Sequence, residues 1–324
     1  MNPGAATGSR FAVPEIDARL VARCDRSASV IDFAGATMGT TWKVRLALSP
    51  GRDQPSLQAA IEQRLDVLVA QMSHWSPTSS LALFNRARPA SWSLLPPGFA
   101  AVVKCGLAIA ERSGGAFDPA IGRLTDLWGL GPNPIAVRPA EAAVAEARVA
   151  SGWHRLARSG AWLRQPGDLW LDLSGIAKGH AVDSVADLLG AAGIEHALVE
   201  IGGECVGRGL RPDGDPWWVE LETPPGFAVA PIRVALHQLA VATSGNYTRG
   251  AHTIDPRTGV PVENAPAAVS VVHRSCMTAD AWATALTVLE PSAARQMCEA
   301  EDLAARILSS DGDEWLSPAL VAMF

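Results

Sequence analysis

One stretch, residues 169–201, limits the choice of fold more than any other part of the chain. It starts with a short apolar run that contains a single acid, residues 169–173, and this pattern predicts a buried strand. A turn follows at 174–175, and apolar residues then recur at helical spacing over 176–189. Glycines end that helix, and residues 197–201 predict a second strand. The stretch therefore predicts a central strand–helix–strand unit.

The turn at the start of that helix is a candidate anion site. Exposed amides at a helix N-terminus favour a negative group, and Asp172 and Lys178 flank this turn. An ordinary crossover with a solvated turn has the same sequence pattern, so this segment alone leaves both interpretations open.

Composition excludes several classes of protein. The chain has 324 residues, 48% of them hydrophobic, which is enough for a large core. Its net charge is −6 and its Lys and Arg residues form no basic run. We therefore expect no nucleic-acid partner, because binding phosphates needs a basic face. The five cysteines are scattered without a Cys-x-x-Cys pair, which indicates neither a disulfide framework nor a zinc cluster.

The first 30 residues show no recognisable targeting signal. Residues 1–17 lack the apolar segment of a secretion signal and a lipid-attachment cysteine. No unbroken run of about 18 apolar residues predicts a transmembrane segment. Because residues 1–30 also lack sustained periodicity, we expect a cytoplasmic protein with a loosely ordered arm over 1–30 and a single domain over 31–324.

Helical and strand patterns fill the rest of the chain. Helices are predicted over 56–72, 96–113, 139–150 and 275–289, and strands over 42–48, 153–162, 205–210, 217–222, 232–241 and 269–273.

Two glycine-containing turns could approach a planar ligand. Met38 lies in a tight segment over 35–39, and a thioether packs well on an aromatic ring, although most methionines are core residues. In residues 114–119, paired glycines precede Phe117 and the turn-initiating pair Asp118-Pro119. Such a turn is equally typical of a structural corner.

The helix expected over 275–289 offers oxygen ligands. Thr278 is a candidate N-cap, which places Asp280 in the first turn. Asp280 and Thr284 are four residues apart and share one face among small residues. Magnesium prefers such oxygens and takes few protein groups besides phosphate oxygens and water. The alternative is a helix-start acid with an incidental threonine.

A strong turn signal lies at 255–259, between two strand-like runs. His252 and Asp255 bracket it. A histidine here can act as an acid–base group or simply cap a hairpin.

Together and in this order, these segments resemble the ApbE-like FAD:protein FMN transferases. The resemblance extends from Ile31 to about residue 310. The motifs that carry it are Met-Gly-Thr at 38–40, Ser-Pro-Thr-Ser at 76–79 with Leu-Phe-Asn at 83–85, Gly-Ala-Phe-Asp-Pro at 115–119 with Leu-Trp-Gly at 127–129, Leu-Asp-Leu-Ser-Gly-Ile-Ala-Lys-Gly at 171–179, Gly-Gly at 202–203, Ala-Thr-Ser-Gly-Asn-Tyr at 242–247, His252 with Ile-Asp-Pro-Arg-Thr-Gly at 254–259, and Met-Thr-Ala-Asp-Ala at 277–281 with Thr-Ala-Leu at 284–286.

The resemblance implies an α+β fold of mixed β-sheets with flanking helices and an FAD cleft between its parts. It implies a transferase that cleaves FAD with magnesium, attaches FMN as a phosphoester to a threonine of a target flavoprotein and releases AMP. The residues that would contact FAD are Met38, Trp75, Ala116, Phe117, Asp118, Asp172, Lys178 and Ile254. The carbonyl oxygen of Gly175 would hold the metal together with Asp280 and Thr284.

The base that accepts the threonine proton is assigned to His252 or Asp255. Two other functions remain open: an FAD pyrophosphatase that yields FMN and AMP, and a flavin-binding protein without catalytic activity. The chain departs from the family pattern in three places. Trp75 stands where a tyrosine is usual, the segment between Tyr247 and His252 is short, and no export signal is evident.

Overall fold

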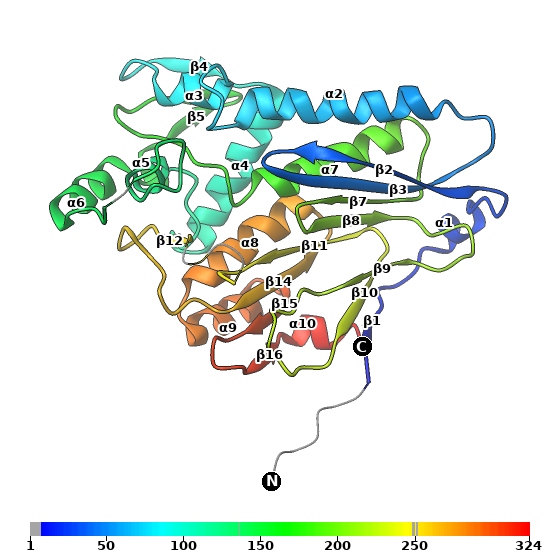
Figure 1. Ribbon diagram of the computed structural model, residues 1–324. Coiled ribbons are helices and arrows are strands. Elements are labelled where there is room, and N and C mark those ends of the chain that lie inside the picture. The colour runs from blue at the N-terminus through cyan, green and yellow to red at the C-terminus, as the bar shows by residue number, and fades with distance from the viewer. Residues whose placement is uncertain (1–7, 136, 248–249, 251) are drawn as a thin grey trace, which may run out of the picture.

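The computed structural model describes residues 8–135, 137–247, 250 and 252–324, and its centre is an eight-stranded sheet (Figure 1). From edge to edge the strands are β16 (Glu314–Leu316), β15 (Ala304–Leu308), β14 (Ala268–His273), β11 (Leu239–Ser244), β8 (Glu204–Arg208), β7 (Ala197–Ile201), β3 (Thr40–Leu48) and β2 (Ser29–Thr37). Every neighbouring pair is antiparallel.

The long helices cover one face of this sheet. The helices are α1 (Ala18–Ala22), α2 (Gln54–Met72), α3 (Ser80–Asn85), α4 (Pro97–Arg112), α5 (Gly122–Leu127), α6 (Glu141–Ala150), α7 (Ala177–Ala191), α8 (Cys276–Val288), α9 (Pro291–Ala300) and α10 (Pro318–Val321), with a 3₁₀ turn η1 (Trp153–Arg155). α7 and α8 pack against each other and against the central strands, and α2 and α4 lie outside them (Figure 1).

Three small sheets complete the fold. They are β1 (Arg10–Ala12), β10 (Ile232–Leu236) and β9 (Trp217–Glu220); β4 (Trp92–Leu94), β6 (Trp162–Arg164) and β5 (Ala157–Ser159); and β12 (Ile254–Asp255) with β13 (Val260–Pro261). The first of these sheets and α10 share a second apolar cluster with strands of the large sheet. The α+β class implied by the resemblance is confirmed.

Local sequence explains the hairpin of β2 and β3. Trp42, Val44 and Leu46 alternate with exposed residues and are at most 2% exposed, so one face of β3 lies in the core. Met38 and Gly39 form the turn, with φ of 51° and 73°. Positive φ at both central residues is typical of a two-residue hairpin turn, whose twist matches that of the strands. The tight segment predicted near Met38 is therefore the tip of a hairpin.

The first strand of the predicted strand–helix–strand unit is absent, although α7 and β7 are confirmed. Residues 169–173 are extended, but their backbone groups pair with a loop and a side chain instead of a ladder. The N–H of Asp172 donates to the Pro119 carbonyl at 2.9 Å, and that of Leu171 donates to Asn85 Oδ1 at 2.8 Å. Apolar periodicity predicts burial here but does not identify the hydrogen-bond partner.

Three other segments differ from the sequence predictions. The run 232–241 is divided into β10 and β11 at Gln238, whose φ is 57°. Residues 153–162 form η1 and β5 and reach β6 only at their end. Residues 8–30 are not a loose arm throughout, because β1 pairs in parallel with β10 and the N–H of Asp17 donates to His237 Nε2 at 3.1 Å. Residues 1–7 lie outside the described residues.

Within the described residues, no helix has both the length and the apolarity needed to span a bilayer.

Candidate active site

The start of α8 is fixed to α7 by two features. A Cβ built on Gly179 would lie 2.3 Å from the carbonyl oxygen of Cys276, so only glycine allows the two backbones to approach this closely. Asp183 of α7 accepts hydrogen bonds from the N–H groups of Cys276 and Met277 at 2.9 and 3.0 Å. An acid at a helix N-terminus satisfies free amides and complements the helix dipole. The two helices are thereby held in one register.

The N-cap of α8 is Ser275, and Thr278 is not the cap, which corrects the sequence prediction. Ser275 Oγ accepts from the N–H of Thr278 and donates to Asp183 Oδ2 at 2.8 Å. Asp280 therefore lies beyond the first turn, where it is buried. It still shares a helix face with Thr284, because that spacing does not depend on the cap.

The predicted metal ligands lie along this junction, which we call the α7–α8 seam and define as Gly175, Lys178, Gly179, Asp280 and Thr284. Asp280 is 3% exposed, and its Oδ2 accepts the Gly179 N–H at 2.9 Å. A Cβ on Gly175 would lie 2.7 Å from Thr284 Oγ1, so glycine lets the backbone at 175 reach the hydroxyl.

The donor set of the seam fits magnesium. One carboxylate, one hydroxyl and one backbone carbonyl are hard oxygen donors, and Mg²⁺ uses few protein ligands when substrate phosphates supply the rest. Among residues 8–135, 137–247, 250 and 252–324, no three His, Cys, Asp or Glu side chains gather as a ligand cluster. Sites built from three such side chains, which are typical of catalytic zinc, therefore do not describe this one.

Two buried carboxyl groups and one ammonium meet at the seam. Lys178 Nζ forms an ion pair with Glu204, which is 2% exposed at the start of β8. Burial raises the pKa of Glu204 to about 8, with the Lys178 ammonium opposing it. Burial also raises the pKa of Asp280, and again the ammonium opposes the shift. Two buried carboxylates thus face one lysine, an arrangement that favours an added cation.

Asp172 lies at the turn that leads into α7. Its Oδ1 accepts from the Ser174 N–H at 2.8 Å and from Ser174 Oγ at 2.6 Å, and His74 Nδ1 lies 3.8 Å away. Next to this histidine, Trp75 is 64% exposed, with the two rings edge to face. The structure thus brings Asp172 and an exposed indole to one rim of the seam.

Ala116, Phe117 and Asp118 form a structural corner beside Asp172. The side chains of Ala116 and Phe117 are buried in the core, at 1% and 4% exposure. Asp118 accepts from the N–H groups of Ala120 and Trp153 at 2.7 and 3.0 Å. Burial raises the pKa of Asp118 to about 6 although both hydrogen bonds oppose it. The chain here offers a ligand its backbone more than its side chains.

Met38 lies at the tip of the β2–β3 hairpin, beside the turn that precedes Glu204. A Cβ on Gly202 would lie 2.9 Å from Thr40 Cγ2, and the N–H of Gly202 donates to the Thr41 carbonyl at 3.0 Å. Two turns therefore meet at this end of the sheet.

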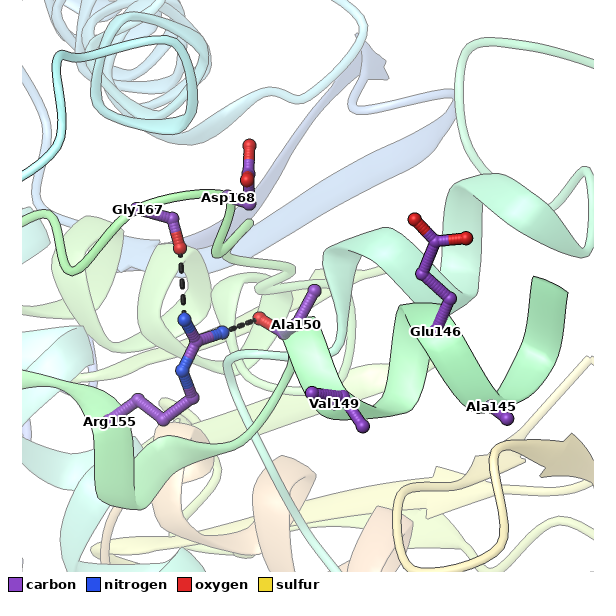
Figure 2. A pocket seen from close by; sticks show the side chains of 7 residues that line it. All are labelled: Ala145, Glu146, Val149, Ala150, Arg155, Gly167 and Asp168. Atoms are coloured by element: carbon purple, nitrogen blue, oxygen red, sulfur yellow. Dashed lines mark hydrogen bonds between the residues drawn. The ribbon is translucent and has the colours of Figure 1, made fainter. Parts of the chain in front are cut away.

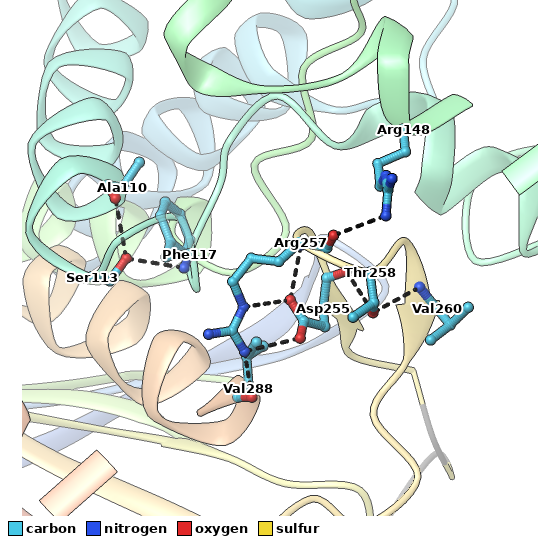
Figure 3. A network of polar contacts seen from close by, with 9 residues as sticks. All are labelled: Ala110, Ser113, Phe117, Arg148, Asp255, Arg257, Thr258, Val260 and Val288. Carbon is cyan, nitrogen blue, oxygen red and sulfur yellow. Dashed lines mark hydrogen bonds and ion pairs between the residues drawn. The ribbon is translucent and has the colours of Figure 1, made fainter. Parts of the chain in front are cut away.

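Of the two candidate bases, Asp255 lies on the β12–β13 hairpin and His252 lies two residues before it, and they differ in their hydrogen-bond partners. Asp255 accepts from Arg257 Nε and from its second guanidinium nitrogen at 2.9 Å each, which occupies both carboxylate oxygens. Arg257 in turn donates to the carbonyl of Val288 at the end of α8, as Figure 3 shows. This network gives Asp255 a structural role, because it orients the guanidinium that joins the hairpin to α8. Ile254 is buried against Leu124 of α5 in a separate small cluster.

His252 keeps an acceptor nitrogen. Its Nδ1 lies 2.8 Å from the Gly250 carbonyl oxygen. Because a carbonyl can only accept, Nδ1 carries the proton in the neutral imidazole, and Nε2 then has a free lone pair. The short segment between Tyr247 and His252 lies mostly outside the described residues.

A separate hollow of about 510 Å³ lies between α6 and the segment before residue 169 (Figure 2). It is lined by Ala145, Glu146, Val149, Ala150, Arg155, Gly167 and Asp168. The Arg155 guanidinium donates to the carbonyls of Ala150 and Gly167, the latter at 3.0 Å. Because its one cationic group is used in this way and two carboxylates line its wall, the hollow does not suit a pyrophosphate.

Sequence reasoning assigned no role to three residues that shape the site. Asp183 lies within the segment analysed first, but its role as a cap for a helix some 90 residues away has no local signal. Asn85 holds the 169–173 segment through its amide, with Nδ2 donating to the Leu171 carbonyl at 3.1 Å. Glu204 could have been noticed as a lone acid between Gly202-Gly203 and an apolar run.

Comparison with known proteins gives one consistent result. The model of the ApbE family matches residues 38–307. An FAD:protein FMN transferase of Vibrio cholerae is 36% identical over 297 residues, which cover 88% of this chain and 89% of that protein. The solved structure of the flavin transferase ApbE from Vibrio cholerae has a TM-score of 0.86 at 34% identity, covering 92% of this chain and 100% of that one. The apo flavinyl transferase ApbE of Pseudomonas stutzeri has a TM-score of 0.85 at 35% identity, covering 92% and 97%.

Both the match along the sequence and the agreement in fold extend over most of the chain. This chain therefore belongs to the ApbE family and is an enzyme of the transferase class.

Proposed function

We propose that this enzyme is a magnesium-dependent FAD:protein FMN transferase that attaches FMN to a threonine hydroxyl of a target flavoprotein and releases AMP. The observation that carries the proposal is the α7–α8 seam, where the backbone at Gly175 packs on the Thr284 hydroxyl and the Lys178 ammonium stabilises the charged form of the buried Asp280 carboxylate. Hard oxygens beside a fixed cation suit a bound metal–pyrophosphate.

Phosphoryl transfer depends mostly on positioning and charge neutralisation, and different residues of the chain would provide each of these. A bound Mg²⁺ would neutralise the pyrophosphate and make its phosphorus more electrophilic. Lys178 would contact the same phosphates. The rim formed by Met38, Trp75 and the backbone at 116–118 would hold the isoalloxazine and its ribityl chain, and Asp172 and Ile254 would contact the remaining part of FAD.

The proton of the acceptor threonine needs a base. We assign it to His252, because Nε2 retains its lone pair whereas both oxygens of Asp255 are occupied by Arg257. In the step, the threonine oxygen bonds to the FMN phosphorus and its proton passes to Nε2. The bond from that phosphorus to the bridging oxygen breaks, and AMP leaves.

The test measures two products of one reaction, the modified flavoprotein and AMP. The purified enzyme is incubated with FAD, Mg²⁺ and a candidate flavoprotein, and intact-mass spectrometry of the flavoprotein is compared with AMP release. We expect an FMN-sized adduct on the flavoprotein and an equal amount of AMP. AMP without an adduct would identify an FAD pyrophosphatase, and FAD that stays whole would identify a flavin-binding protein without activity.

A further inference from the structure

Glu204 borders the seam, and neither the metal nor the nucleotide contacts assigned above account for it. It follows the Gly202-Gly203 turn, and its side chain is almost fully buried. Oε1 pairs with Lys178 Nζ, while Oε2 is buried and has no hydrogen-bond partner within the described part of the chain. A buried carboxylate with an unsatisfied oxygen lowers stability. The stability of the fold therefore does not explain a glutamate at this position.

Lys178 lies between two buried carboxylates. Its ammonium pairs with Glu204, whereas the N–H of the next residue, Gly179, donates to Asp280 Oδ2 at 2.9 Å. The ammonium is close enough to Asp280 to stabilise the charged form of that carboxylate. An ammonium that moved onto Asp280 would neutralise the carboxylate and compete with a divalent cation for the same oxygens.

We propose that Glu204 is a positioning residue that holds the Lys178 ammonium away from Asp280, so that the Asp280 carboxylate stays available to a divalent cation. The inference rests on the proposed function, in which Asp280 is a metal ligand. It also gives Lys178 a fixed place from which to contact the phosphates. The unpaired Oε2 fits this role, because competing donors would weaken the hold of Glu204 on the ammonium.

Mn²⁺ binding to the full chain, followed by electron paramagnetic resonance without FAD, tests the inference apart from activity. Glu204→Gln removes the charge that holds Lys178, and we expect Mn²⁺ affinity to fall by about tenfold or more. Adding Lys178→Met to Glu204→Gln removes the competing ammonium and should restore most of the lost affinity. Lys178→Met alone should bind Mn²⁺ at least as tightly as the parent.

Glu200→Gln is the matched control. Glu200 belongs to the same β7–β8 hairpin and accepts the Gly203 N–H at 3.0 Å, so its substitution changes this turn while the Glu204 carboxylate stays in place. We expect parent affinity for this variant. Glu204→Gln at parent affinity, a double variant as weak as Glu204→Gln, or weaker binding by Lys178→Met would each overturn the role of Glu204. If the parent itself binds no Mn²⁺, the metal assignment is wrong as well. This result distinguishes a failure of the proposed function from a failure of the proposed role of Glu204.

Discussion

The α7–α8 seam supplies the proposed metal ligands, whereas the β12–β13 hairpin region supplies the candidate bases. The two regions are held in place differently. The seam is part of the core: Asp280 is buried, and Gly179 contacts the backbone of α8. The hairpin consists of two strands of two residues each, and Arg257 attaches it to α8 by donating to the Val288 carbonyl, while Asp255 orients the guanidinium through an ion pair within the hairpin. Seam residues are therefore coupled to folding, whereas hairpin residues can be changed almost independently of it.

The largest effect is expected for Asp280→Asn. An asparagine can still accept the Gly179 N–H, so the packing of the seam is kept while the ligand charge is lost. We expect AMP release to fall by about a thousandfold or more, because charge neutralisation at the pyrophosphate depends on the metal. Since burial raises the pKa of Asp280, the neutral side chain should leave the free energy of unfolding unchanged or higher.

The measurements for Asp280→Asn are steady-state AMP release with FAD and Mg²⁺, and urea unfolding of the metal-free protein. Turnover near the parent rate would remove Asp280 from the metal site. A large loss of stability would show instead that the charge of Asp280 stabilises the fold, which would contradict our expectation for the seam.

Gly179→Ala has the next largest effect, and it acts on stability. Its Cβ would lie 2.3 Å from the Cys276 carbonyl oxygen and 2.8 Å from Met277 Cα, and both are backbone atoms that cannot rotate away. We expect the free energy of unfolding to fall by about 3 kcal/mol. Gly190→Ala is the control on the same helix, because nothing lies within 4 Å of its Cβ position. It should gain about 0.5 kcal/mol. Equal values for the two variants in urea unfolding would contradict the close packing of the seam.

The same contrast separates what the sequence could predict from what it could not. The seam residues are close in sequence within each helix, so helical spacing brought Asp280 and Thr284 to one face. The resemblance supplied the third proposed ligand, Gly175. Neither source indicated that Gly175 must lack a side chain to reach Thr284, because that contact joins segments about 110 residues apart.

At the hairpin, the turn itself was predicted from residues 255–259 and is confirmed by β12 and β13. The sequence left His252 and Asp255 as equal candidates for the base, because both are polar residues beside one turn. Only the positions of the side chains distinguish them: Arg257 occupies Asp255, and a carbonyl acceptor fixes the tautomer of His252. Hydrogen-bond partners of this kind depend on rotamers, which periodicity and turn signals do not report.

The smallest effect is expected at the hairpin, and it tests whether Asp255 is structural. Arg257→Met removes a guanidinium whose side chain is 43% exposed. Exposed pairs contribute little, so we expect the free energy of unfolding to fall by about 1 kcal/mol at most. Flavin transfer should fall only a few-fold, because the hairpin is then attached less firmly to α8.

If Asp255 acts only through its pair with Arg257, Asp255→Asn should have the same effect as Arg257→Met, and the double variant should be no worse than either single one. Rates of FMN attachment for the three variants measure this coupling. A loss of about a hundredfold in Asp255→Asn, with Arg257→Met near the parent rate, would instead make Asp255 the base in place of His252.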